Sequence, residues 1–308
     1  MSPVVTNLEM TSIVIPAYNE EDAIAETVRA CQAELAKTGQ PYEILVVDDG
    51  SSDKTGEIAV AAGARVIRHL NNLGYGRSLK DGIRAATNDT IVITDADGTY
   101  PIDQIPSLVQ MYREGFNMVV GARQGKNYSE SINKGALRFV LKHLVQFTAG
   151  RKIPDINSGL RIFSRREAVP YFNYLGDAFS FTTSITLAYM MNGMFIKYLP
   201  INYEKRTGRT KVHLFKDSLR TLQCIVEAIL FFNPMKIFLV FCGGMLVLSA
   251  ICFGDDLLFG HFTAFLLGVG GVLLSFLMFG MGLVSIQLRQ IMMSVRKRDV
   301  VTPQTTIK

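Results

Sequence analysis

The chain has 308 residues, which is enough for one α/β domain of about 200–250 residues and a smaller second part. Hydrophobic residues make up 48% of the chain, a fraction above the usual range of soluble domains. The excess concentrates after Phe231. The net charge is +5 and no block of like charge resembles a nucleic-acid-binding tail. Composition therefore argues against a nucleic-acid partner and is compatible with phosphates or anionic lipid.

From Thr11 to about Leu199, short β-branched runs alternate with longer stretches of helical periodicity. This alternation predicts an α/β fold with a mostly parallel sheet that helices cover on both faces. Strands are expected at Ser12–Pro16, Tyr42–Val47, Ala64–Arg68, Thr90–Thr94 and Asn117–Val120. Helices are expected at Glu21–Ala36, Lys54–Ala62, Gly76–Ala86 and Asp103–Arg113.

The rest of the chain is predicted to lie on and in a membrane. Leu214–Leu230 places apolar and charged residues on opposite sides of a helix, which fits a domain helix or, given the apolar stretch that follows, an interfacial one. Ile237–Phe253 and Phe262–Leu288 can each cross a hydrocarbon core, which needs about 20 helical residues. No lysine or arginine occurs between Ile237 and Leu288, which argues against a buried hairpin of a soluble domain.

The charges that flank these two stretches predict their orientation. The connection Gly254–His261 carries only acidic charges, whereas both outer flanks are basic and should face the cytoplasm. The basic residues are Arg206, Arg209, Lys211, Lys216, Arg220 and Lys236 before the pair, and Arg289, Arg296, Lys297 and Arg298 after it. We therefore expect an integral membrane protein with two spans and both termini in the cytoplasm. Its parts would be a cytoplasmic domain (1–211), an interfacial amphipathic helix (212–233), two transmembrane helices with a short acidic loop (234–290) and a cytoplasmic basic tail (291–308).

Polar clusters directly follow three of the expected strands, and open α/β sheets bind ligands at the carboxyl ends of their strands. After the fourth strand, Asp95 and Asp97 place two carboxylates at positions i and i+2. Such a pair can present oxygen ligands to Mg²⁺ or Mn²⁺ together with substrate phosphates. Because aspartate is also common in turns and helix caps, the pair alone is a weak signal.

The cluster DDGSSD after the second strand has three acids in six positions. Gly50 is expected to make a turn, and Ser52 or Asp53 to cap the next helix. Capping needs only one such residue, and like charges this close require a cation or hydrogen-bond donors. The excess of acid therefore favours a ligand site that includes Asp48 and Asp49.

Two further segments carry weaker signals. In IPAYNE, which closes the first strand, Asn19 is a candidate N-cap, and Tyr18 either packs or forms a wall for a nucleotide base. Asn72-Leu73-Gly74-Tyr75-Gly76-Arg77 offers glycines for close backbone approach. Each of these segments is unremarkable when it is taken alone.

Taken in order, these motifs resemble those of the family 2 glycosyltransferases, which have the GT-A nucleotide-diphospho-sugar fold. The matching segments are Val14–Glu20, Val46–Thr55, Asn72–Gly82 and Asp95–Pro101, with Gly121–Arg123 and Asn157–Arg161 further on. The likeness covers about the first 210 residues. With the paired apolar stretches, the chain resembles the polyprenyl-phosphate glycosyltransferases, the group of dolichol-phosphate mannose synthase and bacterial undecaprenyl-phosphate sugar transferases.

The resemblance implies roles for individual residues. The nucleoside pocket would be lined by Pro16, Tyr18, Glu20 and Asp48, with Asp49 beside them. Asp95 and Asp97 would hold Mg²⁺ or Mn²⁺, with Asp97 the more direct ligand, and Arg123 would lie near the acceptor phosphate.

Basic residues later in the chain have two open interpretations each. Arg206, Arg209 and Lys211 would belong to a basic loop that closes over the diphosphate, or to a juxtamembrane segment bound to lipid headgroups. Lys134 and Arg138 lie on a helical stretch and would bind the lipid phosphate or face solvent.

The chain departs from the family pattern at two places. Thr99 stands where related enzymes often carry a metal-ligating glutamine, and a hydroxyl is a poorer ligand. The segment 179–185, with Thr182, Thr183 and Ser184, has no carboxylate where many members have a general base. A sugar hydroxyl benefits from a base, whereas a phosphate monoester, with a second pKa of about 6, is mostly dianionic at neutral pH. The missing carboxylate therefore predicts a lipid-phosphate acceptor.

The sequence thus predicts metal-dependent, inverting transfer of one sugar from a UDP- or GDP-sugar to a polyprenyl phosphate at the cytoplasmic membrane face. A processive polysaccharide synthase is disfavoured because such enzymes rely on a QxxRW motif and this chain has no tryptophan. The intact acidic motifs disfavour a catalytically degenerate membrane scaffold. The expected partners are the nucleotide-diphosphate sugar, the polyprenyl phosphate and membrane lipid, with a homo-oligomer left open.

Overall fold

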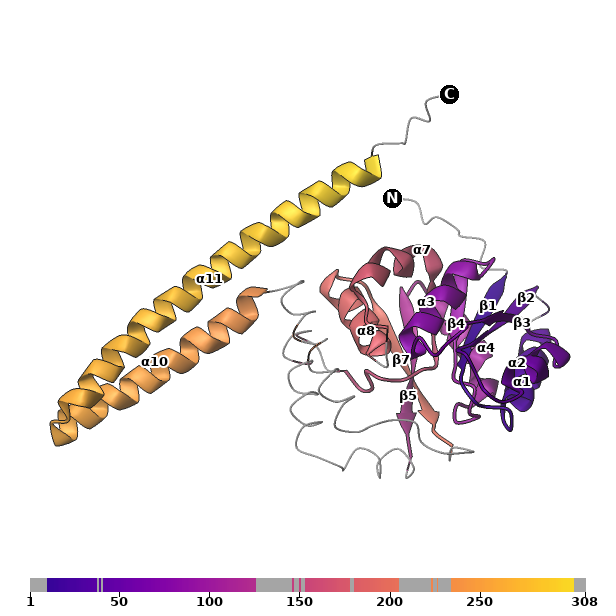
Figure 1. Ribbon diagram of the computed structural model, residues 1–308, viewed down its shortest axis with the longest axis horizontal. Helices are drawn as coiled ribbons and strands as arrows, with labels where there is room; N and C mark the ends of the chain where they lie inside the picture. Colours follow the sequence, from indigo (N-terminus) through magenta and orange to yellow (C-terminus); the bar gives the residue numbers. More distant parts are fainter. Residues whose placement is uncertain are drawn as a thin grey trace. The chain divides into compact units, whose positions relative to one another are not determined.

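The computed structural model describes residues 10–37, 39, 41–125, 146, 150, 153–177, 180–204, 223, 226 and 234–301. The chain forms two compact units, Met1–Ile225 and Val226–Lys308. The first unit holds a sheet with helices on both faces, and the second holds two long helices (Figure 1).

The sheet of the first unit has seven strands in the order β3-β2-β1-β4-β6-β5-β7. The strands are β1 (Thr11–Ala17), β2 (Tyr42–Asp48), β3 (Arg65–Arg68), β4 (Thr90–Ile93), β5 (Met118–Gln124), β6 (Arg161–Ser164) and β7 (Ile196–Asn202). Only β6 runs antiparallel to its neighbours in this described sheet; the other pairings are parallel. The expected mostly parallel sheet is therefore confirmed, and all five expected strands form.

Helices bury both faces of the sheet, which is why its strands read as nearly continuous apolar runs. The helices of this unit are α1 (Ile24–Ala36), α2 (Thr55–Ala61), α3 (Tyr75–Ala85), α4 (Ile105–Tyr112), α7 (Arg165–Ala168) and α8 (Phe181–Met191), with short 3-10 turns η1 (Ile102–Gln104) and η2 (Val169–Tyr174). One core contains α1, α2 and α4, and the other contains α3, η2 and α8 (Figure 1). Side chains alternate between the two cores, so Ile13 and Ile15 enter the first and Val14 enters the second.

Helix α3 lies very close to the sheet at Gly82. A Cβ atom at this glycine would stand 2.5 Å from Cγ1 of Val14 and 2.8 Å from Cγ2 of Val47. Because packed cores do not deform freely, this contact restricts where α3 can lie. The contact therefore also restricts the position of Tyr75, the first residue of α3.

The expectation that Asn19 caps the first helix is wrong. Helix α1 begins at Ile24 and Ala23 occupies its N-cap position. Asn19 instead has a φ of 50° and accepts a hydrogen bond from the N–H of Ser52 at 2.8 Å. Asparagine tolerates this left-handed conformation better than most residues, and here its side chain joins two loops.

The second unit contains α10 (Pro234–Phe259) and α11 (Phe262–Val301), two helices that are long and apolar enough to cross a membrane. They pack antiparallel, since Gly282 lies against Phe238 and Gly268 against Phe253. The connection is shorter than the expected Gly254–His261, because α10 continues to Phe259. Apart from Gln223 and Val226, the expected interfacial helix lies outside the described residues. The boundaries of the four expected parts stay a prediction.

Candidate functional site

The loops after β1 and β2 meet at the carboxyl edge of the sheet. Strand register places Pro16 beside Val47 and Ala17 beside Asp48. The N–H of Asn19 donates to Oγ of Ser51 at 2.9 Å, and the N–H of Glu20 donates to Oγ1 of Thr55 at 2.8 Å. Two expected pocket residues, Tyr18 and Glu20, are half-buried in the first of these loops. Hydrogen bonds thus hold Tyr18 and Glu20 in the loop that lies next to Asp48.

Asp48 is fully buried at the end of β2. Its Oδ1 accepts the N–H of Ser51 at 2.9 Å. Its Oδ2 lies 3.4 Å from Nε of Arg68 and accepts no hydrogen bond among the described residues. A buried carboxylate oxygen of this kind retains the capacity to accept a donor.

The turn expected at Gly50 is present. Gly50 has a φ of 74°, and a Cβ atom there would lie 2.6 Å from the carbonyl carbon of Asn71. Glycine is therefore required by both conformation and space. The N-cap position of α2 is Lys54, and Oδ1 of Asp53 accepts the N–H of Thr55 at 3.0 Å. The cap contact predicted for Ser52 or Asp53 thus comes from Asp53, one residue before the N-cap position.

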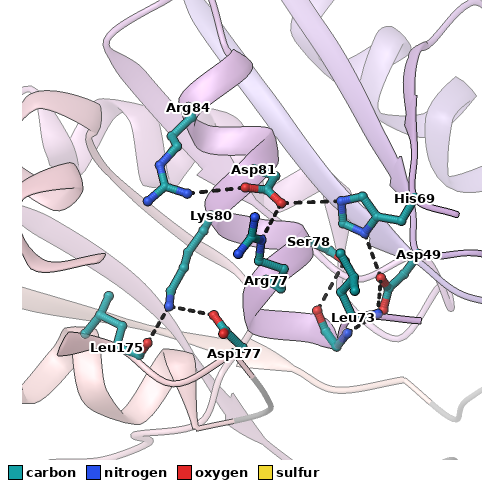
Figure 2. Close-up of polar contacts among 11 residues, drawn as sticks. Asp49, His69, Leu73, Arg77, Ser78, Lys80, Asp81, Arg84, Leu175 and Asp177 are labelled. Carbon is teal, nitrogen blue, oxygen red and sulfur yellow. Dashed lines mark hydrogen bonds and ion pairs between the residues drawn. The ribbon is translucent and has the colours of Figure 1, made fainter. Parts of the chain in front are cut away.

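Asp49 accepts hydrogen bonds from the loop between β3 and α3. Its Oδ1 accepts the N–H of Leu73 at 2.9 Å and lies 2.7 Å from Nδ1 of His69, and its Oδ2 accepts the N–H of Gly74 at 2.8 Å (Figure 2). Nε2 of His69 lies 3.5 Å from Oδ2 of Asp81. Protein donors therefore offset the charge of Asp49, and its part in ligand binding stays a prediction.

Asp95 and Asp97 lie in the loop that follows β4. Asp97 is buried, and its Oδ1 accepts the hydroxyl of Thr99 at 2.6 Å and the N–H of Thr99 at 3.2 Å. Asp95 is half-buried, and its Oδ1 accepts the hydroxyl of Tyr75 at 2.8 Å. Thr99, at the position where a glutamine is common, thus contacts Asp97 through its side chain. Burial and the charge of Asp95 raise the pKa of Tyr75 well above its usual range, so Tyr75 stays a donor.

This carboxylate pair fits a hard divalent cation that a diphosphate helps to bind. Among the described residues, no group of three or more histidine, cysteine, aspartate or glutamate side chains is arranged to hold a metal ion. Mg²⁺ typically takes one or two carboxylates, substrate phosphates and water. Asp95 and Asp97 would supply the two carboxylates of such a set, and phosphate oxygens and water would supply the rest.

Arg123, which we expected near the acceptor phosphate, pairs with Asp155. Its Nε donates to Oδ2 at 2.7 Å and its Nη2 to Oδ1 at 3.0 Å. Burial raises the pKa of Asp155, but the charge and hydrogen bonds of Arg123 outweigh burial and lower it overall. The guanidinium also lies 5.3 Å from the ring centre of Tyr203, whose ring packs edge-on against Tyr100 at 5.5 Å. Arg123 is thus connected to the loop of Asp95 and Asp97.

Arg161 is a fully buried cation that binds neutral acceptors. Its Nε donates to the carbonyl of Ser158 at 3.0 Å, and its Nη1 donates to the carbonyl of Thr182 at 3.0 Å and to Oγ1 of Thr186 at 2.9 Å. The hydroxyl of Thr183 donates to Oδ1 of Asn157. These bonds join the segment before β6 to the first turns of α8, where Thr182, Thr183 and Ser184 are buried.

Five expected site residues lie outside the described part of the chain, and their roles stay predictions: Lys134, Arg138, Arg206, Arg209 and Lys211. Sequence reasoning also missed contacts. Tyr75 lies in the segment 72–77, in which the sequence suggested a role only for the glycines. Asp155 lies two residues before the motif Asn157–Arg161, and a buried partner for Arg123 has no local signal in the sequence.

Comparison with known proteins identifies the family of this chain. The model of glycosyl transferase family 2 matches residues 12–169. The chain belongs to glycosyl transferase family 2. The expected family and the GT-A-like fold are thereby confirmed.

Relatives with assigned activities match about half of this chain. Undecaprenyl-phosphate 4-deoxy-4-formamido-L-arabinose transferase of Klebsiella pneumoniae is 37% identical over 164 residues, which cover 51% of this chain and 50% of the relative. The enzyme of the same name from Salmonella paratyphi A is 34% identical over the same shares. This chain therefore spans about half the length of these relatives.

This chain is also similar in fold to solved structures of glucosyl-3-phosphoglycerate synthase of Mycobacterium tuberculosis. Its complex with Mn²⁺, UDP and phosphoglyceric acid has a TM-score of 0.59 at 21% identity, covering 71% of this chain and 78% of that one. Its complex with Mg²⁺ and UDP has a TM-score of 0.58 at 20% identity, covering 71% and 79%. At this identity the likeness concerns the fold.

Proposed function

We propose that this family 2 chain transfers one sugar, with inversion, from a UDP- or GDP-sugar to a polyprenyl phosphate at the cytoplasmic membrane face. The observation that carries the proposal is the pair Asp95 and Asp97 at the carboxyl edge of a GT-A-like sheet, in the same loop system as Asp48. The membrane part rests on α10 and α11, two helices able to span a bilayer.

Three features support a nucleotide-diphosphate sugar as donor. Asp48 lies beside the loop of Tyr18 and Glu20 at the carboxyl edge of the sheet, where its carboxylate would accept an N–H of a nucleobase. The two carboxylates at Asp95 and Asp97 fit a cation shared with a diphosphate. A synthase of the same fold was crystallised with UDP and Mn²⁺ or Mg²⁺, which supports the same ligand class here.

The acceptor is inferred from the relatives and from the chemistry of α8. Relatives that match this chain over 164 residues are named as undecaprenyl-phosphate sugar transferases. The first turn of α8 offers Thr182, Thr183 and Ser184, which are buried and are not bases at neutral pH. A phosphate dianion needs no base to become a nucleophile.

The reaction balances without a proton transfer to the protein. An oxygen of the acceptor phosphate forms a bond to the anomeric carbon while the bond from that carbon to the diphosphate oxygen breaks on the opposite face. The leaving group is the nucleoside diphosphate, which takes the bonding electron pair. A divalent cation at Asp95 and Asp97, when bound, supplies positive charge next to the diphosphate. Asp48 would orient the nucleoside, and holding both reactants in line lowers the entropy cost of their encounter.

The arrangement of the chain in the membrane is also part of the proposal. We place residues 1–211 and 291–308 in the cytoplasm, 212–233 at the interface and 234–290 across the bilayer as a hairpin. Basic residues at the two ends of the hairpin, such as Lys236 and Arg289, support this orientation. The basic loop 205–211 would then contact the diphosphate or the lipid headgroups.

The test is transfer by the full chain in nanodiscs, with a panel of UDP- and GDP-sugars, undecaprenyl phosphate and Mn²⁺ or Mg²⁺. We expect one donor class to react and Asp97→Asn to lower the rate by about 100-fold or more, because charge stabilisation of this kind contributes that much. The matched control is Asp103→Asn, an exposed acid in η1, which should react like the parent. Equal rates for Asp97→Asn and the parent would overturn the assignment of the pair.

A further inference from the structure

We propose that Tyr75 is a positioning residue for this reaction: its hydroxyl orients the carboxylate of Asp95 so that Asp95 can bind the cation. The inference rests on the proposed function, because it assigns a role to a residue of the same site. Tyr75 itself would touch neither the sugar nor the cation.

The direct evidence is the contact between the two side chains. The Tyr75 hydroxyl donates to Oδ1 of Asp95 at 2.8 Å across 20 positions of sequence. On another side, the carboxylate lies against Gly159, where a Cβ atom would stand 3.0 Å from Cγ of Asp95. A side chain held at two points has little rotational freedom, so its oxygens keep one orientation before the cation arrives.

Tyr75 is the first residue of α3, and the turn before it is held firmly. Asp49 binds the N–H groups of Leu73 and Gly74, the two residues that precede Tyr75 (Figure 2). The same carboxylate contacts His69, which also approaches Asp81 on α3. Asp49 thus connects the end of β2 to the start of α3, which gives this buried acid a function in building the site.

Further along α3, two contacts set the position of the whole helix. Gly82 lets the helix pack directly on the sheet, as described above. Nζ of Lys80 donates to Oδ1 of Asp177 at 2.7 Å and to the carbonyl of Leu175 (Figure 2). A helix held by the sheet, the β2 loop and the segment before α8 can hold the Tyr75 hydroxyl in place. Residues that orient metal ligands in this way typically contribute about 10–100-fold in metal affinity.

The experiment measures binding of Mn²⁺ alone to the full chain in nanodiscs, from the EPR signal of the free ion. The variants are Tyr75→Phe, which removes only the hydroxyl, and Tyr42→Phe, a control at the opposite end of the sheet where β2 begins. Asp97→Asn and Asp95→Asn each remove one of the two proposed cation ligands and therefore test whether Mn²⁺ binds at this site. Thermal unfolding of each variant verifies that it is folded.

We expect Tyr75→Phe to bind Mn²⁺ about 10–100-fold more weakly than the parent, with the control unchanged. In an Asp95→Asn background, adding Tyr75→Phe should change the affinity little, because the hydroxyl acts through Asp95. The apparent KM for Mn²⁺ in transfer should rise with the dissociation constant. Thermal unfolding midpoints should stay near that of the parent.

Two results would overturn the proposal while leaving the proposed function intact. One is an affinity of Tyr75→Phe equal to that of the parent while Asp97→Asn loses binding. The other is an equal loss of Mn²⁺ affinity when Tyr75→Phe is made in the parent and in the Asp95→Asn background, which would indicate a general structural effect. If the parent and Asp97→Asn bind Mn²⁺ equally, the metal site of the proposed function itself fails.

Discussion

The carboxylate of Asp95 lies directly against the backbone of Gly159. A Cβ atom at residue 159 would stand 2.7 Å from Oδ1 of Asp95, which is closer than real Cβ contacts allow. The N–H of Gly159 donates to the hydroxyl of Tyr100 at 2.6 Å, so the glycine cannot move away freely. Glycine is needed here for space, and this close contact links the motif Asn157–Arg161 to the acidic pair.

Replacing Gly159 with alanine should displace the Asp95 carboxylate. We expect Gly159→Ala to weaken Mn²⁺ binding about tenfold or more, since the ligand loses its orientation. The control is Gly254→Ala, a helical glycine of α10 with nothing within 4 Å of the added Cβ. EPR titration with Mn²⁺ measures the change, and parent-like affinity in Gly159→Ala would show that Asp95 is free to move.

The pair Arg123 and Asp155 should make stability depend on pH. Because the folded pKa of Asp155 is lowered by Arg123, its contribution is present above the unfolded pKa of about 3.9 and is lost as pH falls through the folded pKa. At pH 7, Asp155→Asn should cost about 3–5 kcal/mol, because it leaves a largely buried guanidinium without its charge partner.

Thermal unfolding of the parent and Asp155→Asn from pH 7 downwards tests this. The gap between their unfolding midpoints should be constant near neutral pH and narrow below a pH of about 4. A gap that stays the same down to the lowest pH at which the parent remains folded would contradict the ion pair as its source.

Arg161 should matter for stability more than an exposed arginine does. Arg161→Met would leave the buried carbonyl of Ser158 without the guanidinium donor, at a cost of about 1–3 kcal/mol, whereas the carbonyl of Thr182 keeps the hydroxyl of Thr186 as a donor. Arg166→Met removes an exposed ion pair with Asp89 and should cost about 0–1 kcal/mol. Thermal unfolding of the two variants compares them directly. Equal unfolding midpoints would contradict the claim that Arg161 contributes more to stability than Arg166.

The pH dependence of transfer should follow the acceptor. If the phosphate activates itself, kcat/KM falls as pH drops through its second pKa of about 6. A phosphonate analogue of the polyprenyl phosphate, whose second pKa is higher, should shift this limb of the profile upwards. An identical limb for both acceptors would identify a protein group as the base and contradict self-activation.

The hairpin of α10 and α11 predicts a specific labelling pattern. In a variant without the native cysteines, His261→Cys at the hairpin connection should react with a membrane-impermeant maleimide in intact cells. Glu114→Cys, an exposed position of the first unit, should react only after the membrane is opened. The reverse pattern would show that the orientation is inverted.

The order of the expected strands and helices, the two apolar stretches and the acidic pair follow from the sequence without the structure. The strands, helices and apolar stretches depend on local periodicity. Asp95 and Asp97 are two positions apart in the chain and directly follow a strand, so the sequence already places both at the carboxyl end of that strand. The turn at Gly50 was predictable too, because it depends on the conformation of a single residue.

The residues that support the acidic pair could not be predicted from the sequence and are known from the folded structure. Tyr75 reaches Asp95 across 20 positions, and Arg123 reaches Asp155 across 32. The N–H donors that satisfy Asp49 come from 24 and 25 positions further on, so no local pattern in the sequence predicts these contacts. Such partners are set by the packing of α3 and of the segment before β6 onto the sheet, since contacts between distant segments depend on the whole fold and leave no period in the sequence.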